Sequence, residues 1–510
     1  MVLKGRITIR RCWTLTFRTC LLLIFFVIPQ SLQANFDFNA NCFKAYKQIF
    51  ELKLNNARQL LQAEKKLNPD NCIVPMLENY IDYFYLLTSE SKTEFERLQH
   101  YKARRMEQLE AGDRNSPYYL YAQAEINLQW ALIRGRYGEY LTAAREIRKA
   151  KSQLQENAEK FPGFHLNAKG LGLINAFLGN LPDGILKSAL ATVGIKGDLE
   201  AGMAMLDRLA TNLPKSTSAA FYDEGVFYYV FVLNDIAHSP TAYAKTMKYT
   251  ASISDSSLLK TYLQALVCSK NAHNDEAISI LASRPVGASY QDFPYLSFLS
   301  GLVKLNMLDY SSAQDFTRFL QENKGVNYIK DAYLHLVWIA LLKDGTAAYS
   351  AQMAKVKKQG YTYHDKDRQA LSEAEAPQPD KRLLKARLLY DGGYYSQALK
   401  LLAGLKGGDF DDGRDKTEYY YRLGRIQGAM GRDDEALSAY QSAINLGKNL
   451  RYYFAANSAL QIGNILEAKR NYAKAKAFFS IAIQMKNHDY ESSIETQAKA
   501  GIRRITKLSD

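Results

Sequence analysis

The acidic run Asp409–Asp415 holds several carboxylates close together, which is the kind of ligand that a Ca²⁺ ion requires. Counted from Asp409, its glycine stands fifth and Tyr420 stands twelfth. A calcium-binding EF-hand loop instead needs glycine at the sixth position and glutamate at the twelfth. The run also joins two expected helices, where solvated Asp and Gly are usual. We therefore interpret it as a loop and predict no metal.

The seven histidines are scattered along the chain, and they do not form the His-Glu-x-x-His signature. A Gly-x-Ser-x-Gly elbow and a phosphate-binding P-loop are missing as well. His335 stands in an apolar stretch, so we interpret it as a core histidine rather than a base. The sequence therefore predicts no enzyme and no cofactor.

Three cysteines lie beyond residue 34, and two of them form a candidate pair. If residues 43–51 and 55–67 make an antiparallel hairpin, Cys42 and Cys72 come to the same end of it. A Cys42–Cys72 disulfide is then geometrically feasible in an oxidising compartment. The alternative, two small buried thiols, stays equally open. Cys268 is expected to be an inert core thiol.

Small and aromatic residues recur near the C-terminus with a fixed spacing. Each position of the first copy is displaced by 39 residues in the second. The first copy is Tyr420, Leu423, Gly424, Gly431, Ala436, Tyr440 and Ala443, and the second is Ala459, Ile462, Gly463, Arg470, Ala475, Phe479 and Ala482. Small residues at such positions let two antiparallel helices approach closely, and the aromatic residue fills the gap to the next pair.

This pattern resembles the tetratricopeptide repeat (TPR), with Arg470 standing where a glycine is expected. The resemblance implies an all-α fold of helical hairpins that stack into a right-handed superhelix. It also implies an adaptor that binds a protein or peptide on its concave face. In the family the first helix of each pair lines the groove. The candidate partner-binding residues are therefore Tyr420, Arg422, Arg425, Asn457 and Asn464.

Weaker copies of the pattern extend towards the N-terminus, although ordinary amphipathic hairpins would give a similar spacing. The domains that we expect are an N-terminal TPR-like region (35–160), a glycine-rich middle segment (161–240), degenerate TPR-like hairpins (241–372), a proline-containing linker (373–380) and the C-terminal repeats (381–510). In the middle segment, the composition of Val226–Leu233 suits a strand, but its helical surroundings favour a core helix.

The middle segment also faintly resembles a eukaryotic family of TPR proteins that includes the inclusion-body clearance proteins of the mitochondrial surface. The resemblance depends on the turn Gly194–Asp198 and on Gly202 and Leu206 in the helix expected after it. It implies an all-helical fold and says little about activity.

The first 34 residues are typical of an export signal, with a basic start, the apolar run Leu21–Ile28 and a cleavage site after Ala34. An uncleaved anchor stays open. The lack of an Asn-x-Ser/Thr acceptor favours a bacterial periplasm over a eukaryotic secretory route. We expect an exported protein, with peripheral membrane association left open.

The formal net charge is +14, and five of the basic residues belong to the expected signal. The remaining surplus is too small for a nucleic-acid-binding stripe, so no nucleic-acid partner is expected. The chain has 35 tyrosines, most of which we assign to packing between helices and the rest to recognition of a partner. The favoured function is a non-catalytic scaffold. The alternatives are a carrier of lipid or another apolar ligand, suggested by Leu166–Leu190, and an enzyme with its site in residues 161–240.

Overall fold

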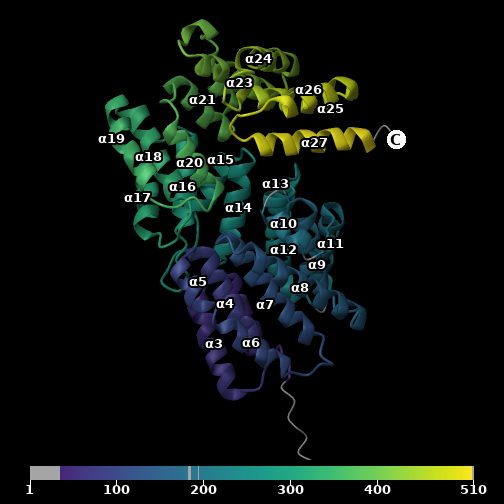
Figure 1. The fold of residues 1–510 in the computed structure, drawn as a ribbon. Coiled ribbons are helices and arrows are strands. Elements are labelled where there is room, and N and C mark those ends of the chain that lie inside the picture. The colour runs from purple at the N-terminus through teal and green to yellow at the C-terminus, as the bar shows by residue number, and fades with distance from the viewer. Residues whose placement is uncertain (1–34, 182–184, 193, 217, 508–510) are drawn as a thin grey trace, which may run out of the picture.

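The structure is a computed structural model that describes residues 35–181, 185–192, 194–216 and 218–507. Every regular element in these ranges is a helix, which confirms the predicted all-α class. The predicted export signal, residues 1–34, lies outside the described residues. Across the described ranges, no helix combines the length and the apolar character that crossing a bilayer would need. In Figure 1 the chain runs from purple helices at the foot of the view to yellow helices at its top.

The N-terminal helices are built on amphipathic stripes. In one of them, the buried residues Leu54, Ala57, Leu61 and Glu64 follow helical spacing, so a single face turns inward. These helices are α2 (Ala40–Phe50), α3 (Leu54–Leu67), α4 (Ile73–Ser89), α5 (Lys92–Leu98), α6 (Tyr101–Glu110), α7 (Tyr118–Arg136) and α8 (Tyr140–Lys160).

The glycine-rich middle segment forms helices that touch backbone to backbone. A methyl group built on Gly202 would lie 2.4 Å from the Ala176 nitrogen, and one on Gly172 would lie 2.9 Å from Leu206. Glycine at both positions therefore lets α9 and α11 pack closely. The elements here are α9 (Asn167–Gly179), α10 (Ile185–Thr192), α11 (Leu199–Asn212), the 3₁₀ turns η1 (Leu213–Lys215) and η2 (Ala219–Phe221), α12 (Tyr222–Phe231) and a π-helical turn η3 (Val232–Ile236).

The predicted core helix at Val226–Leu233 is confirmed, since α12 spans most of it and η3 continues it. Eight further helices follow. They are α13 (Ala242–Thr250), α14 (Leu258–Lys270), α15 (Asn274–Ala282), α16 (Tyr295–Asn306), α17 (Ser312–Glu322), α18 (Ile329–Lys343), α19 (Thr346–Lys358) and α20 (Asp365–Glu375). One continuous apolar core runs from α2 to α16.

After a short non-helical stretch at 376–380, Asp380 caps the next helix by accepting the backbone N–H of Arg382 at 2.7 Å. The last elements are α21 (Lys381–Asp391), α22 (Tyr395–Leu402), the 3₁₀ turn η4 (Gly407–Asp409), α23 (Gly413–Ala429), α24 (Asp433–Gly447), α25 (Phe454–Ala468), α26 (Tyr472–Gln484) and α27 (Glu491–Lys507). Each helix from α23 to α26 packs on the one that follows it, as in a helical-hairpin solenoid.

The C-terminal pairs have the contacts that the TPR-like spacing predicts. A methyl group on Gly424 would lie 2.6 Å from the Tyr440 ring, and one on Gly463 would lie 2.5 Å from the Phe479 ring. The glycines are thus the points at which the two helices of a pair meet. The Phe479 ring also faces Gly501, at 2.5 Å by the same measure, so α27 joins the stack by the same kind of contact.

Candidate functional site

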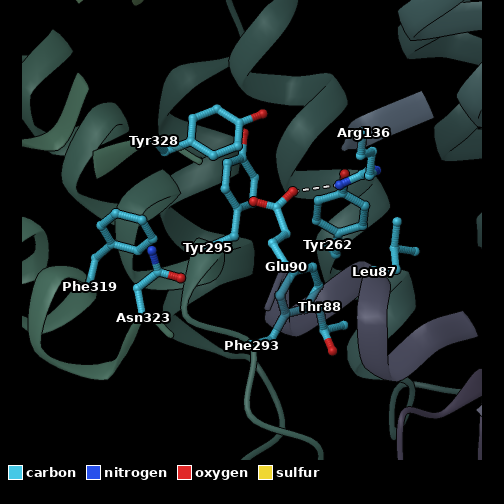
Figure 2. Close-up of a pocket in the computed structure, with 10 residues that line it drawn as sticks. All are labelled: Leu87, Thr88, Glu90, Arg136, Tyr262, Phe293, Tyr295, Phe319, Asn323 and Tyr328. Carbon is cyan, nitrogen blue, oxygen red and sulfur yellow. Dashed lines mark hydrogen bonds and ion pairs between the residues drawn. The ribbon is translucent and has the colours of Figure 1, made fainter. Parts of the chain in front are cut away.

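A small cavity of about 40 Å³ lies where the ends of α4 and α7 meet α14, α16, α17 and the start of α18 (Figure 2). It is named the tyrosine pocket here, because three tyrosines stand around it. Its lining residues are Leu87, Thr88, Glu90, Arg136, Tyr262, Phe293, Tyr295, Phe319, Asn323 and Tyr328. The pocket therefore joins side chains that are more than two hundred positions apart in the sequence.

An ion pair stands at the centre of the tyrosine pocket, where Arg136 Nη1 donates to Glu90 Oε1 at 2.5 Å. Glu90 caps the end of α4 with a left-handed backbone, at φ 49°. Burial raises the pKa of its carboxyl, while Arg136 and a hydrogen bond from Asn327 act in the other direction. The Arg136 side chain is 37% exposed, and its guanidinium is held against the Glu90 carboxylate.

Tyr328 is a second residue of the tyrosine pocket with a left-handed backbone, at φ 62°. The conformation is held by the buried carboxylate of Asp367, which accepts the Tyr328 N–H at 2.6 Å and the Lys330 N–H at 2.8 Å. Two such non-glycine conformations, at Glu90 and at Tyr328, border one cavity. Strained backbone of this kind gathers at sites where side chains must be held in place for a ligand.

A hydrogen bond with His364 holds the Tyr328 hydroxyl in place. Its Nδ1 accepts the Lys366 N–H at 3.1 Å, which leaves the ring proton on Nε2, 3.0 Å from the Tyr328 oxygen. The imidazole therefore donates to the hydroxyl. Burial lowers the pKa of His364 to about 4, and Arg136 contributes to the same shift. At neutral pH this histidine is an uncharged donor.

The chemistry of the tyrosine pocket is that of recognition. Burial raises the pKa of Tyr295 and Tyr328 well above the usual value, so both are protonated hydroxyls at neutral pH. The rings offer apolar faces, while the hydroxyls, Arg136 and Asn323 offer donors. Such a surface suits a small polar or acidic group.

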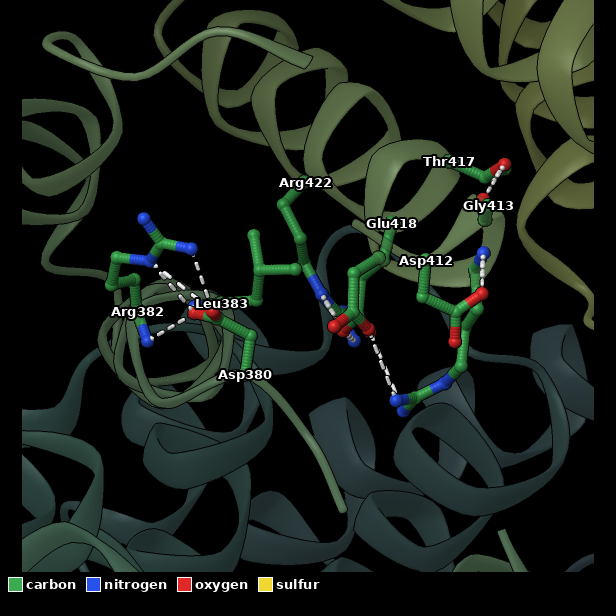
Figure 3. Close-up of polar contacts among 10 residues, drawn as sticks. Asp380, Arg382, Leu383, Asp412, Gly413, Thr417, Glu418 and Arg422 are labelled. Carbon is green, nitrogen blue, oxygen red and sulfur yellow. Dashed lines mark hydrogen bonds and ion pairs between the residues drawn. The ribbon is translucent and has the colours of Figure 1, made fainter. Parts of the chain in front are cut away.

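The candidate residues on α23 occupy different environments. Arg422 is 2% exposed and its Nη2 lies 2.8 Å from the Glu418 carboxylate, as Figure 3 shows. It therefore supports the packing of α23 and does not offer a free guanidinium to a partner. Arg425 is half-buried, with its guanidinium 3.9 Å from the centre of the Tyr390 ring. Tyr420 is half-buried against Gly407.

The two candidate asparagines lie on α25 and belong to one row of amides. Gln461 donates to the Asn457 Oδ1 at 3.1 Å, and Asn464 donates to the Gln461 Oε1 at 3.4 Å. All three side chains are half-buried. The structure thus brings Asn457 and Asn464 together through a glutamine that the repeat pattern had not singled out. Their binding role stays a prediction.

Two aspartates of the acidic run Asp409–Asp415 accept backbone N–H groups near the start of α23. Asp409 accepts the backbone N–H of Lys406 at 2.6 Å. Asp412, labelled in Figure 3, caps α23 by accepting the backbone N–H of Arg414 at 3.0 Å. Throughout the described chain, no three His, Cys, Asp or Glu side chains are placed to hold a metal ion.

Cys42 and Cys72 are buried free thiols in the structure. The Cys42 sulfur lies 3.5 Å from the Asn71 amide, and the Cys72 sulfur donates to the Gln108 carbonyl at 3.4 Å. Burial raises the pKa of Cys42 to about 12 and that of Cys72 to about 11, so both stay protonated. The Cys42–Cys72 disulfide stays a prediction.

A buried polar cluster, which the sequence analysis missed, links the middle segment to the N-terminal helices. Lys169 Nζ lies 2.7 Å from Glu125 Oε2 and also pairs with Glu224. The Tyr80 hydroxyl lies 2.8 Å from Glu125 and 2.6 Å from Glu224. All of these residues are at most 1% exposed, so no substrate reaches them in this structure. Charged residues among the buried positions of α7, α9 and α12 were the available signal.

No protein-family model and no curated protein matches the chain. Among solved structures, it is similar to the TPR domain of P58(IPK), with 13% identity and a TM-score of 0.22, covering 75% of this chain and 99% of that one. It is also similar to yeast Tom70, with 12% identity and a TM-score of 0.24, covering 92% of this chain and 96% of that one. These likenesses are remote. The packing contacts within the chain itself make it an all-α stack of helical hairpins.

Proposed function

We propose that this chain is a non-catalytic scaffold that holds a segment of a partner protein on its concave face, with the tyrosine pocket as its principal contact. The observation that supports this most strongly is the pairing of an aromatic lining with the half-exposed Arg136. Aromatic rings and arginine dominate the binding energy of protein interfaces, because they combine large apolar area with directed donors.

The left-handed backbone of Glu90 and Tyr328 is a second observation that supports a binding role for the tyrosine pocket. Holding Glu90 and Tyr328 in that backbone region costs about 1 kcal/mol each, in the range known for such strain. Asp367 stabilises one of them and the Arg136 ion pair the other. A site arranged in advance in this way loses little conformational entropy when a partner binds.

A carrier of apolar ligands is less well supported. Of the two cavities described here, neither is lined by residues 161–240. In that segment, Leu173 and Leu206 are at most 1% exposed and pack within the α9–α11 contact. The alternative of an enzyme in residues 161–240 is also less well supported. The helices there pack closely, and the Lys169 cluster is closed to solvent.

The proposal is tested by placing a photo-crosslinking aromatic residue, benzoylphenylalanine, at Phe293, which lines the pocket. The control is the same substitution at Val286, which is 79% exposed and does not line the pocket. We expect the position at 293 to give a crosslinked partner, whose segment is mapped by mass spectrometry and then synthesised. The synthetic segment should bind the purified chain and should bind the Tyr295→Ala variant at least about tenfold more weakly. Equal crosslinking from both positions would contradict the placement.

We also propose that the scaffold acts after export, on the basis of the basic start and apolar run of residues 1–34. N-terminal sequencing of the protein purified from its native cells tests this. A mature chain that starts close to residue 35 and is found in the periplasmic fraction is the expected result. A cytoplasmic chain that retains Met1 would contradict it.

A further inference from the structure

A second concavity, with a volume of about 440 Å³, lies between α6, the end of α7 and the start of α8. It is named the α6–α8 groove. Four cations line it: Lys102, Arg134, Arg145 and Lys149. Of the residues that line it, only Glu146 is a carboxylate. The groove is therefore electropositive, in contrast to the balanced ion pair of the tyrosine pocket.

The negative charge of Glu146 is already shared. Its Oε1 lies 2.5 Å from Lys102 Nζ and 3.1 Å from Arg134 Nε. Arg145 and Lys149 are exposed on α8, and in the described chain neither forms an ion pair. Two cations at the rim of the groove thus lack a counter-charge from the protein.

The cations of the groove also act on one another. Burial lowers the pKa of Lys102, and the charges of Arg134 and Lys149 lower it further, although Glu146 opposes them. Like charges gathered in a concavity repel, and that repulsion is relieved when an anionic group enters. The charge pattern thus fits an anionic occupant.

Apolar surface accompanies the charge. Ala103 and Met106 line the groove, and the exposed side chains of Tyr101 and Leu141 stand next to lining residues, at 42% and 49% exposure. A small inorganic anion would use none of this surface, whereas a peptide chain with acidic and apolar side chains would use both kinds.

We propose that the α6–α8 groove docks an acidic segment of a partner protein. The carboxylates of that segment bind Arg145 and Lys149, and its apolar side chains lie on Met106 and Ala103. The surface is separate from the tyrosine pocket, so a partner can occupy one while the other is free. The inference does not rest on the function proposed for the tyrosine pocket.

The test uses the double variant Arg145→Glu, Lys149→Glu. Both side chains are exposed, so the fold is expected to tolerate the change. The matched control is Lys355→Glu, Lys358→Glu, which makes the same change of charge on two exposed positions of α19. The probe is a labelled peptide rich in glutamate and leucine, and the same peptide with glutamine in place of glutamate reports on charge. Binding is measured by fluorescence anisotropy.

We expect the glutamate peptide to bind the unmodified chain and the α19 control with similar affinity, and to bind the groove variant about tenfold more weakly or worse. Raising the salt concentration should weaken binding to the unmodified chain. If the groove variant fails to fold, the milder pair Arg145→Gln, Lys149→Gln serves in its place.

Several outcomes would overturn the assignment. They are equal binding by the groove variant, equal binding of the glutamine peptide, or a chain that binds inorganic phosphate or phosphatidylserine vesicles but not the glutamate peptide. The crosslinking result at Phe293 is independent of all of them. A failure of one proposal is thus distinguishable from a failure of the other.

Discussion

Arg134 and Arg136 stand two residues apart in the last turn of α7, and their guanidinium groups bind carboxylates in two different places. Arg134 contacts Glu139 and Glu146, whereas Arg136 contacts Glu90. Two residues turn an α-helix through about 200°, so the two arginines leave the helix on opposite sides. The end of α7 therefore forms one wall of the tyrosine pocket and one wall of the α6–α8 groove.

Removing these two arginines should have different effects on stability. The Arg134 side chain is 12% exposed, and Glu146 beside it has one oxygen without a partner in the structure. Arg134→Ala should therefore lower the free energy of unfolding by about 2 kcal/mol, because it leaves Lys102 as the one ion-pair partner of a nearly buried carboxylate. Arg136→Ala should lower it by less than about 1 kcal/mol, since Arg136 is 37% exposed. Urea denaturation of both variants measures the difference, and equal losses would contradict the assignment.

The glycines of the C-terminal pairs offer a second test. Gly424→Ala should lower the free energy of unfolding by about 2 kcal/mol, because the added methyl group would overlap the Tyr440 ring. Gly428 is a matched control on the same helix, where the nearest atom to an added methyl group is 3.7 Å away. Gly428→Ala should raise stability by up to about 1 kcal/mol through helix propensity.

Thermal unfolding followed by circular dichroism compares these two alanine variants. A Gly424→Ala variant as stable as Gly428→Ala would show that the helices of this pair do not meet at Gly424. Replacing Tyr440 by leucine in the Gly424→Ala background should recover part of the loss, since it removes the overlapping ring.

The C-terminal contacts were predictable from the sequence because each is local. Gly424 and Tyr440 are sixteen positions apart, as are Gly463 and Phe479, so a fixed spacing encodes each contact. No fixed spacing in the sequence predicts the residues of the tyrosine pocket. Glu90 and Tyr328 meet only because helices from distant parts of the chain pack together, and neither residue stands in a recognisable motif.

The repeat pattern also did not predict which polar side chains are buried. Arg422 has the position of a groove residue in the repeat, yet its neighbour Glu418 and the ring of Phe454 hold it inside. The spacing fixes which helix a residue belongs to, but the direction of a long side chain depends on partners that only the folded structure reveals.

Charge reversal on α23 should consequently separate stability from binding. Arg422→Glu would place a second carboxylate beside buried Glu418, and we expect a loss of about 4 kcal/mol. Arg425→Glu should cost about 1 kcal/mol, since the half-buried side chain loses both its contact with the Tyr390 ring and its ion pair with Asp391 at 3.6 Å. Chemical denaturation checks both values. Only Arg425→Glu is then suited to a partner-binding assay, and similar losses in the two variants would show that Arg422 is not held as described.

His335 makes the stability of the α16–α18 region depend on pH. The sequence predicts a satisfied core histidine, and the structure confirms it: Nδ1 lies 2.7 Å from the Asp331 carbonyl oxygen and the ring stacks on Phe316. Burial lowers the pKa of His335 from 6.5 to about 4. In the unfolded chain the imidazole gains its proton below about pH 6.5, whereas in the folded chain it does so only near pH 4.

The unfolded state therefore binds more protons between these two values, and His335 should destabilise the fold as the pH falls from 6.5 to 4, by about 3 kcal/mol in full. Asp331 acts in the opposite direction over an overlapping range, because burial raises its pKa to about 7 and the folded state keeps its proton. The two effects are separated by comparing the chain with the variant His335→Gln, which cannot titrate but can still donate a hydrogen bond. We expect the variant to lose less stability than the unmodified chain over this range in urea denaturation. Parallel pH profiles for the two proteins would mean that His335 is protonated in the folded state as readily as in the unfolded one.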